Sequence, residues 1–401
     1  MQIQLTFIII SILLIILWLT IDYTVGKRNH LSKLKRRTFP IRESSLQIFT
    51  NGPELFDDLF SELKAAKQHI HILFYIVKND QFSQDFLNIL KEKAKSGVEV
   101  RLLLDWFGSL KISRKAIDDL KTAGVKFAFS HVPKLPFLFY SFQARNHRKI
   151  AVIDGKIGYI GGFNIGKEYI NKDPKLNPWR DYHLKVTGEG VHDLQKEFLF
   201  DWFKATKTNL QHNSTYFPAL AKGRFRHQIL PYEGLFLEES YSTLIRMAES
   251  SIIIGSPYFI PSPRLVSDLR IALKRGISVT ILVPFITDHF LVKEASFVYF
   301  KKLINEGAEV YEYMKGFYHS KVIIIDDSIC DIGTANFDKR SLFLNHEINC
   351  YVFDKVFIGK VKAILQKDIQ DAKKMELSDL YHIGFWRKIK EVAGRSLSLF
   401  L

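Results

Sequence analysis

Two copies of one polar pattern in this sequence combine residue types that could do chemistry. The first copy is His147-Arg148-Lys149, then Asp154 after four residues, then Gly161-Gly162-Phe163-Asn164 after six more. The second copy, with the same spacing, is His319-Ser320-Lys321, Asp326 and Gly333-Thr334-Ala335-Asn336. A single H-x-K is a common chance tripeptide, but two matched copies 172 residues apart indicate one site that is built twice.

The spacing within each copy predicts which side chains act together. Residues i and i+2 of an extended strand share a face, so His147 and Lys149 point the same way, as do His319 and Lys321. If the halves of the chain pair around a pseudo-two-fold axis, both copies meet at one point. That point then holds two imidazoles and two ammonium groups.

Asn164 and Asn336 add two amide groups to the expected site. Ammonium and amide donors suit a tetrahedral phosphate monoanion or diester. One neutral imidazole can attack phosphorus, and the other, protonated, can donate to the leaving oxygen. Because the lysines supply the positive charge, we expect no metal ion and no other cofactor.

The elements that must position these residues follow from an internal repeat. Residues 55–105 and 237–284 both read as helix, strand, helix, strand, with Gly97 and Gly276 at the expected helix ends. The strands are short, continuous, β-branched apolar runs, typical of strands buried on both faces. The predicted fold is α/β, with two similar α/β/α domains whose mixed, largely parallel sheets are related by a pseudo-two-fold.

The composition agrees with a globular enzyme that acts on an anion. The 401 residues are 47% hydrophobic and 25% charged, which excludes a disordered chain and a polytopic membrane protein. The net charge of +15 indicates an anionic partner, either nucleic acid, a phosphorylated small molecule or an acidic membrane face. Only two cysteines occur, Cys330 and Cys350, so a disulfide framework is excluded and a reducing compartment is favoured.

The N-terminus is predicted to cross a membrane. Residues 3–21 carry no charge and are long enough to span a bilayer core of about 30 Å. A cleaved signal peptide is the alternative, but no basic residue precedes the run and no small-residue cleavage site follows it. Seven basic residues and no acidic one lie between Lys27 and Arg42. This collar places the body on the cytoplasmic side of the cell membrane, either as a topology signal only or also by binding anionic lipid.

The predicted organisation has six parts. They are a transmembrane helix (3–22), a basic juxtamembrane collar (23–45), a first domain (46–206), a linker (207–228), a second domain (229–375) and an amphipathic C-terminal segment (376–401). The C-terminal segment could lie on the membrane surface or pack on the body. The aromatic stretch 137–142 could be buried or could form a lip that contacts lipid.

The doubled motif resembles the phospholipase D superfamily, and within it the bacterial cardiolipin synthases. The resemblance covers nearly the whole chain after the anchor and is carried by residues 146–170, 179–202, 256–262, 296–313 and 336–347. Thr334 stands where the family often has serine, and Gly162 replaces serine in the first copy, as it often does in the synthases. Many members have two N-terminal membrane helices, whereas this chain has one.

The resemblance implies a role for each motif residue. His147 is expected to be the nucleophile that forms a phosphatidyl-histidine, and His319 the general acid and then the base. The phosphate oxygens are expected to be held by Lys149, Lys321, Asn164 and Asn336. Two carboxylates, Asp181 and Glu347, are expected to orient the histidines through the second ring nitrogen. Asp154 and Asp326 complete the catalytic motif, where we expect them to close the strand turn beneath the site.

The function that follows is a phosphatidyltransferase. It would move a phosphatidyl group from one phosphatidylglycerol to another, release glycerol and yield cardiolipin. Hydrolysis with water as acceptor is one alternative, and a phosphodiesterase or nuclease of the same superfamily is another. A non-enzymatic scaffold is a third. Because the excess charge lies beside the membrane helix, we expect phosphatidylglycerol and anionic membrane as partners, and no nucleic acid. The oligomeric state stays open.

Overall fold

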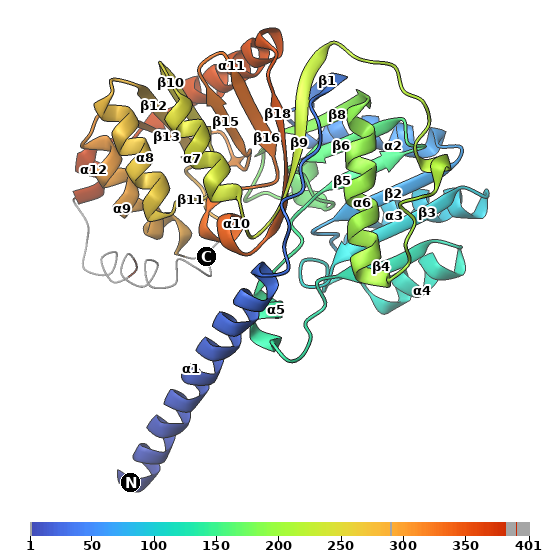
Figure 1. The fold of residues 1–401 in the computed structure, drawn as a ribbon, viewed down its shortest axis with the longest axis horizontal. Helices are drawn as coiled ribbons and strands as arrows, with labels where there is room; N and C mark the ends of the chain where they lie inside the picture. Colours follow the sequence, from blue (N-terminus) through green and yellow to red (C-terminus); the bar gives the residue numbers. More distant parts are fainter. Residues whose placement is uncertain (1, 289–290, 382–389, 391–401) are drawn as a thin grey trace.

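The computed structural model describes residues 2–288, 291–381 and 390, and its first element is a long helix that contacts the body only near its C-terminal end. Helix α1 (Gln2–Leu31) extends away from the body (Figure 1). It is the one candidate membrane span in the described residues, with a mean hydropathy of 2.6 in its most apolar part, none of which is buried. The helix does not end at residue 22 as expected. It continues into the predicted collar, because residues 23–31 lack any helix-breaking proline.

The body is built on one continuous sheet of 15 strands. From its centre outward, the first half of the chain contributes β1 (Arg42–Phe49), β8 (His183–Gly188), β6 (Ile157–Gly161), β5 (Ile150–Ile153), β2 (His69–Phe74), β3 (Glu99–Asp105) and β4 (Lys126–Ser130). The second half contributes β9 (Phe225–Glu233), β18 (His346–Val352), β16 (Ile329–Gly333), β15 (Val322–Ile325), β10 (Ser251–Gly255), β12 (Ser278–Pro284), β13 (Glu309–Tyr313) and β19 (Ala372–Lys374).

Apart from β19, which extends the second half at the edge, the two halves have the same strand order, which confirms the repeat and the two-domain α/β fold. They join where β1 pairs antiparallel with β9, at Ser44 and Phe225 among others. Strand β9 begins inside the range predicted as a linker (207–228), and β1 begins inside the predicted collar (23–45). Both domain boundaries therefore lie closer to the N-terminus than the sequence indicated, because the joining strands are partly polar and lack a continuous apolar run.

The sheet is mixed, as expected, but it is not largely parallel. Only β2–β3, β3–β4, β10–β12 and β12–β13 are parallel pairs, whereas every other junction of the large sheet is antiparallel. The cause is local. Turns of three residues, 154–156 and 326–328, join β5 to β6 and β15 to β16, and such short turns permit only antiparallel pairing.

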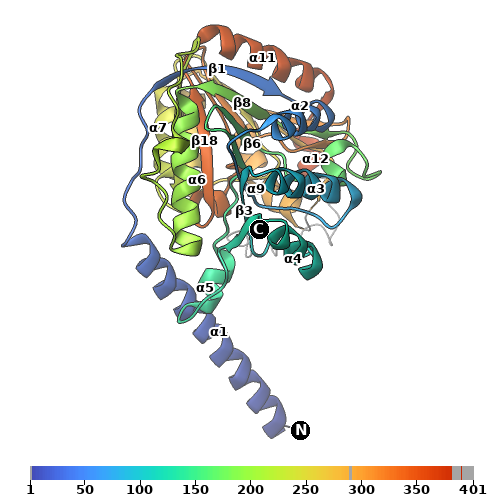
Figure 2. The same ribbon diagram turned by 90° about the vertical axis from the view of Figure 1, so that its right-hand side faces the viewer.

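Helices cover both faces of the sheet (Figure 2). In the first half, α6 (Gly190–Thr206) lies on one face, and α2 (Gly52–Ala65) and α3 (Gln81–Lys95) lie on the other. Successive β3 side chains alternate between these layers, so Leu103 packs in the core with α6 and Leu102 in the core with α3. The remaining α-helices are α4 (Arg114–Thr122), α5 (Leu138–Gln143), α7 (Leu237–Met247), α8 (Pro263–Lys274), α9 (Val292–Ile304), α10 (Lys339–Phe343), α11 (Lys355–Gln370) and α12 (Leu377–Tyr381).

Local sequence signals explain where the repeated helices begin and end. Asp80 caps α3 by accepting a hydrogen bond from the Ser83 amide, and Ser262 caps α8 in the same way. Gly97 and Gly276, predicted at the helix ends, have φ of 89° and 83°, which favours glycine. Of the predicted C-terminal amphipathic segment (376–401), the structure describes residues 376–381, which contain α12, and residue 390. The rest of that prediction lies outside the described residues.

Candidate active site

The two H-x-K segments pair with the opposite half of the molecule. The His147 amide donates to the His346 carbonyl at 2.9 Å, and the His319 amide donates to the Arg180 carbonyl at 2.7 Å. Just before His319, β14 (Phe317–Tyr318) pairs with β7 (Trp179–Arg180) of the first half. His346 directly precedes Glu347, and Arg180 directly precedes Asp181. The main chain of each histidine therefore lies next to a carboxylate residue of the opposite half.

This cross-pairing sets the geometry of both imidazoles. His147 Nδ1 lies 2.9 Å from Glu347 Oε2, and His319 Nδ1 lies 2.6 Å from Asp181 Oδ2. Both carboxylates are fully buried, whereas the histidines keep 9% and 7% of their surface exposed. An N–H at Nδ1 donates a hydrogen bond to the carboxylate, which leaves Nε2 of each ring available for chemistry. The predicted histidine–carboxylate pairs are thus present in the structure, one in each direction across the interface.

The electrostatics of the site favour neutral imidazoles. Burial lowers the pKa of His147, and Glu347 only partly compensates. Burial and the Lys321 ammonium lower the pKa of His319 to about 4. Burial raises the pKa of both carboxyls, but interactions with Lys321 and His319 hold the pKa of Asp181 below its usual value, and interactions with His147 and Lys149 do the same for Glu347. A bound anion would reverse the effect on the histidines, because it favours a protonated ring.

Both motif lysines lie beside the histidines. Lys149 Nζ donates to the His147 carbonyl at 2.7 Å, and Lys321 Nζ donates to the His319 carbonyl and lies 3.6 Å from Asp181 Oδ2. Burial lowers the pKa of Lys149 to about 7 and that of Lys321 to about 8. These ammonium groups are poorly solvated, and an anionic ligand would stabilise their charged form.

The motif asparagines are also buried at this site. Asn164 accepts from the Ile76 amide at 3.1 Å and donates to the Tyr169 hydroxyl at 3.2 Å. Asn336 donates to Asp338 at 3.0 Å. Each side-chain amide has two N–H groups, and these contacts use one of them. Their role in holding phosphate oxygens remains a prediction.

Asp154 and Asp326 lie away from the histidines, at the far ends of β5 and β15. Asp154 accepts hydrogen bonds from the amides of residues 67–69, and Asp326 accepts from those of residues 249–251. Both have φ of 52° and close the turn of a hairpin. Their grouping with the catalytic residues is therefore corrected. The expected role in closing the strand turn agrees with the geometry, because a full strand separates them from the site.

Several residues that shape the site were not identified from the sequence. The Tyr75 ring lies 5.0 Å from that of His147, and the Tyr258 ring lies 6.4 Å from that of His319. Tyr75 directly follows β2 and Tyr258 lies three residues after the corresponding strand β10, so their positions in the repeat are similar but not equivalent. The Trp179 ring lies 4.8 Å from His319, and nothing in the sequence pattern indicates this contact.

The structure also explains why the two motif copies differ at one position. Thr334 donates from its hydroxyl to Glu347 Oε2 at 2.6 Å and helps to hold that carboxylate. The equivalent residue is Gly162, where a Cβ atom would lie 2.0 Å from Asp181 Oδ1. Glycine is required there because the Asp181 carboxylate occupies the space of a side chain.

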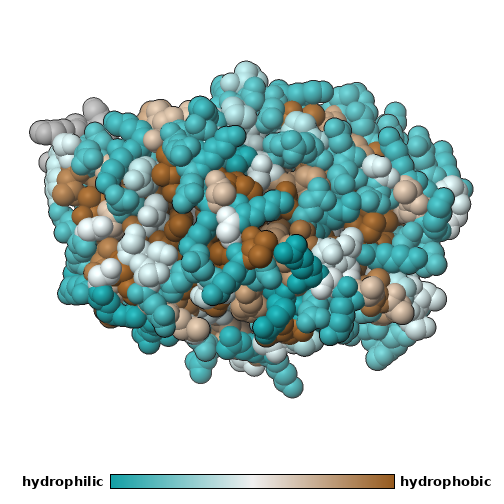
Figure 3. All heavy atoms as spheres, turned by 90° about the horizontal axis from the view of Figure 1, so that it is seen from above, coloured by the Kyte–Doolittle hydropathy of each residue, from teal (hydrophilic) through white to brown (hydrophobic). Residues whose placement is uncertain are grey.

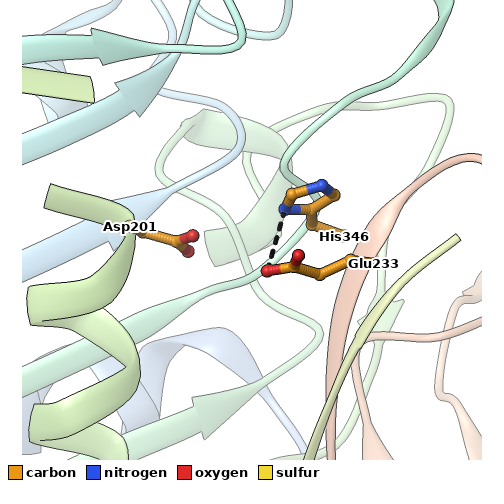
Figure 4. A group of neighbouring side chains, drawn as sticks. All are labelled: Asp201, Glu233 and His346. Carbon is orange, nitrogen blue, oxygen red and sulfur yellow. Dashed lines mark ion pairs between the residues drawn. The ribbon is translucent and has the colours of Figure 1, made fainter. Parts of the chain in front are cut away.

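One group of buried side chains has the composition of a metal site. Asp201, Glu233 and His346 lie together between the two halves, with His346 Nδ1 3.8 Å from Glu233 Oε1 (Figure 4). Arg148 pairs with Asp201 at 2.7 Å, and Arg37 and Lys204 pair with Glu233 at 2.7 Å each. Because these cations already balance the carboxylates, we assign the group to the domain interface and not to metal binding.

The same interactions change the interpretation of the basic collar. Arg37 also pairs with Glu197, Arg42 pairs with Asp193 at 2.9 Å, and Arg36 lies 3.4 Å from Glu239. Three of the seven collar cations therefore join the N-terminal segment to the body. Within the described residues, the other four collar cations, Lys27, Arg28, Lys33 and Lys35, form no ion pair, and Lys27 Nζ lies 5.2 Å from the centroid of the Phe343 ring.

Comparisons with known proteins agree with this geometry. The family described as "Cardiolipin synthase, PLD-like domain" matches residues 59–202 and 241–369. The chain is 41% identical to the minor cardiolipin synthase ClsB of Bacillus subtilis, over 98% of this chain and 99% of that protein. It is 37% identical to a cardiolipin synthase of Staphylococcus aureus, over 90% of this chain and 75% of that protein.

The fold recurs in a solved structure. A phosphatidylserine synthase of Haemophilus influenzae superimposes with a TM-score of 0.73 and 15% identity, covering 94% of this chain and all of the other. At that identity the likeness shows the shared fold. The family match, the near-full-length relatives and the doubled histidine site lead to one conclusion: this chain belongs to the cardiolipin synthase family of proteins with phospholipase D-like domains.

Proposed function

We propose that this protein is a phosphatidyltransferase that makes cardiolipin from two molecules of phosphatidylglycerol. The observation that carries the proposal is the pair of histidines, each bonded through Nδ1 to a buried carboxylate of the opposite half. Such a pair supplies one nucleophile and one proton donor to a single phosphate. The two buried lysines beside them supply positive charge for the phosphate oxygens.

In the first step, Nε2 of neutral His147 attacks the phosphorus of phosphatidylglycerol and forms a P–N bond. The P–O bond to the headgroup glycerol breaks, and protonated His319 gives its Nε2 proton to the departing oxygen. Glycerol leaves as a neutral molecule, and a phosphatidyl-histidine remains. The Glu347 carboxylate balances the positive charge that develops on the His147 ring.

In the second step, His319 is neutral and acts as the base. It takes a proton from a headgroup hydroxyl of the second phosphatidylglycerol, and that oxygen attacks phosphorus. The P–N bond breaks, His147 is restored, and cardiolipin is released. A diester is exchanged for a diester, so the reaction requires no nucleotide.

The proposed location is the cell membrane, with one span and the body on the cytoplasmic side. Arg28, Lys33 and Lys35 follow the apolar part of α1, as the positive-inside rule requires for this orientation. The face of the body opposite α1 is mostly hydrophilic, with only scattered hydrophobic side chains (Figure 3). This distribution supports a body that rests on the membrane on the α1 side and meets water on the other.

The test is the lipid product profile of the full-length protein in phosphatidylglycerol vesicles. Cardiolipin and free glycerol in equal amounts are expected from the wild type, and neither from His147→Ala. Phosphatidic acid as the main product would instead identify a hydrolase. Cleavage of DNA or RNA by the wild type but not by His147→Ala would identify a nuclease. A protein that forms no product but keeps its cellular role after His147→Ala would be a scaffold.

A further inference from the structure

Exposed apolar side chains gather on the body beside α1. They belong to α5, to the loop before it and to the turn after β3, and they are Phe107, Leu110, Val132, Leu135, Leu138 and Phe142. Leu135 is 79% exposed, and the rings of Phe107 and Phe142 lie 5.1 Å apart, so the two segments form one surface. We call these six residues the interfacial surface. Both ribbon views place α5 against the end of α1 nearest the body (Figures 1 and 2).

Contacts between α1 and α5 fix the height of this surface along the anchor helix. Asp22, which is buried, accepts a hydrogen bond from the Tyr140 amide at 2.8 Å. A Cβ atom at Gly26 would lie 2.7 Å from Tyr140 Cβ and 2.8 Å from Phe137 Cβ, so only glycine allows this close packing. The uncharged run ends at Ile21, one residue before Asp22. Helix α5 is thus held at the level where the membrane span ends.

The same segment is connected directly to the catalytic histidine. The buried Arg145 guanidinium donates to the carbonyls of His131 at 2.7 Å and Ser141 at 2.5 Å, and so ties the loop and α5 together. The next residue, Asn146, donates from its amide to Asp105 at 2.9 Å, and His147 follows. A displacement of α5 would therefore be transmitted over a few residues to the site.

We propose that the interfacial surface inserts into the headgroup region of the leaflet in which α1 ends. The body is then held on lipid at two places, by α1 and by the interfacial surface. A lipid surface is the occupant that the structure favours, because the apolar patch continues the apolar span of α1 at the height where the span ends. The inference rests on the proposed membrane location, and its test has a readout besides activity.

The experiment uses full-length protein with a single reactive cysteine. Cys330 and Cys350 are fully buried, so an introduced surface cysteine can be labelled selectively. The variants are Leu135→Cys and Phe142→Cys, each carrying an environment-sensitive fluorophore, in vesicles of phosphatidylcholine and phosphatidylglycerol. Val356→Cys is the matched control, because Val356 is 59% exposed and lies in the first turn of α11, on the side away from α1 (Figure 1).

Labels at residues 135 and 142 are expected to shift to shorter emission wavelengths and to be quenched by lipids that carry bromine on their acyl chains. The label at residue 356 should show neither effect. If the labels at 135 and 142 behave like the label at 356, the interfacial surface lies in water and the inference is wrong. Cardiolipin formation is measured in the same samples, so a water-exposed surface on an active transferase is distinguishable from failure of the proposed function.

Discussion

The Glu347 carboxylate offers the sharpest test of how the two histidines divide the work. Glu347→Gln keeps the shape of the side chain and an oxygen that can accept from His147 Nδ1, so it removes little besides the charge. The carboxylate is fully buried and accepts further hydrogen bonds from Thr334 at 2.6 Å and Ser341 at 3.0 Å. Its charge therefore acts on the His147 ring with little screening by water.

The size of the effect follows from the separation of the charges. The His147 Nδ1 and Glu347 Oε2 atoms lie 2.9 Å apart, which puts the charge centres of an ionised pair at about 4 Å. At an effective dielectric constant of about 20, two unit charges at that distance interact by about 4 kcal/mol. Because His147 becomes positive as it attacks phosphorus, most of this stabilisation is specific to the transition state. Its loss should slow phosphatidyl transfer by about 10³-fold, at about 1.4 kcal/mol for each factor of ten.

The assay compares two donors, phosphatidylglycerol and phosphatidyl-4-nitrophenol, whose leaving group needs no proton. Asp181→Asn is the matched control, because Asp181 acts on His319 in the other half of the site. Nitrophenol release monitors the first step alone. We expect Glu347→Gln to slow both donors about equally, and Asp181→Asn to slow phosphatidylglycerol much more than the nitrophenyl donor.

Two results would refute this reasoning. The first result is that folded Glu347→Gln transfers the phosphatidyl group from phosphatidylglycerol at nearly the wild-type rate. The Glu347 charge would then not stabilise the attack by His147. The second result is that Asp181→Asn slows transfer from both donors equally, while Glu347→Gln transfers from the nitrophenyl donor at nearly the wild-type rate. The roles of the two histidines would then be exchanged. Thermal unfolding of both variants separates these outcomes from a simple loss of folded protein.

Three further perturbations test other parts of the site. Gly162→Ala should abolish phosphatidyl transfer, because the added Cβ would lie 2.0 Å from Asp181 Oδ1 and displace that carboxylate from His319. Product assays measure the transfer, and the unfolding temperature shows whether the variant is folded. A fully active variant would contradict the prediction. The value of kcat/KM should fall as pH rises through about 7 to 8. The reason is that the pKa values of Lys149 and Lys321 are lowered to about 7 and 8, and the charged lysines bind the phosphate. A pH profile that is flat over that range would contradict this. Arg148→Met should destabilise the fold by about 3–5 kcal/mol, because it leaves buried carboxylates unpaired. Equilibrium unfolding measures this against the exposed control Arg36→Met. Equal free energies of unfolding for the two variants would contradict the prediction.

Much of the site could be predicted from the sequence because the chain repeats itself. The matched spacing identified both histidines, both lysines and both asparagines, and the structure joins each histidine to a carboxylate of the opposite half with a lysine beside it. That the asparagines hold phosphate oxygens stays a prediction. The apolar, β-branched runs also indicated the parallel strands β2, β3, β10 and β12. The resemblance added Asp181 and Glu347, whose spacing from the histidines has no local signal.

The rest depends on contacts between segments far apart in the chain. That Glu347 serves His147 and Asp181 serves His319 follows only from the pairing of the two halves. The polar strands β1 and β9, which join those halves, resemble a collar and a linker because neither shows strong apolar periodicity. Arg37 reads as one more juxtamembrane cation, although the folded chain places it on Glu197 and Glu233.

The central claim is that both imidazoles act on one phosphorus atom and that His147 carries the phosphatidyl group. In His319→Ala the second step lacks its base, so the nitrophenyl donor should load the protein and leave it loaded. Mass spectrometry of peptides from that variant, quenched under conditions that preserve a P–N bond, should find one phosphatidyl group on His147. A group on any other residue, or an unmodified His147 peptide after stoichiometric release of nitrophenol, would contradict the account.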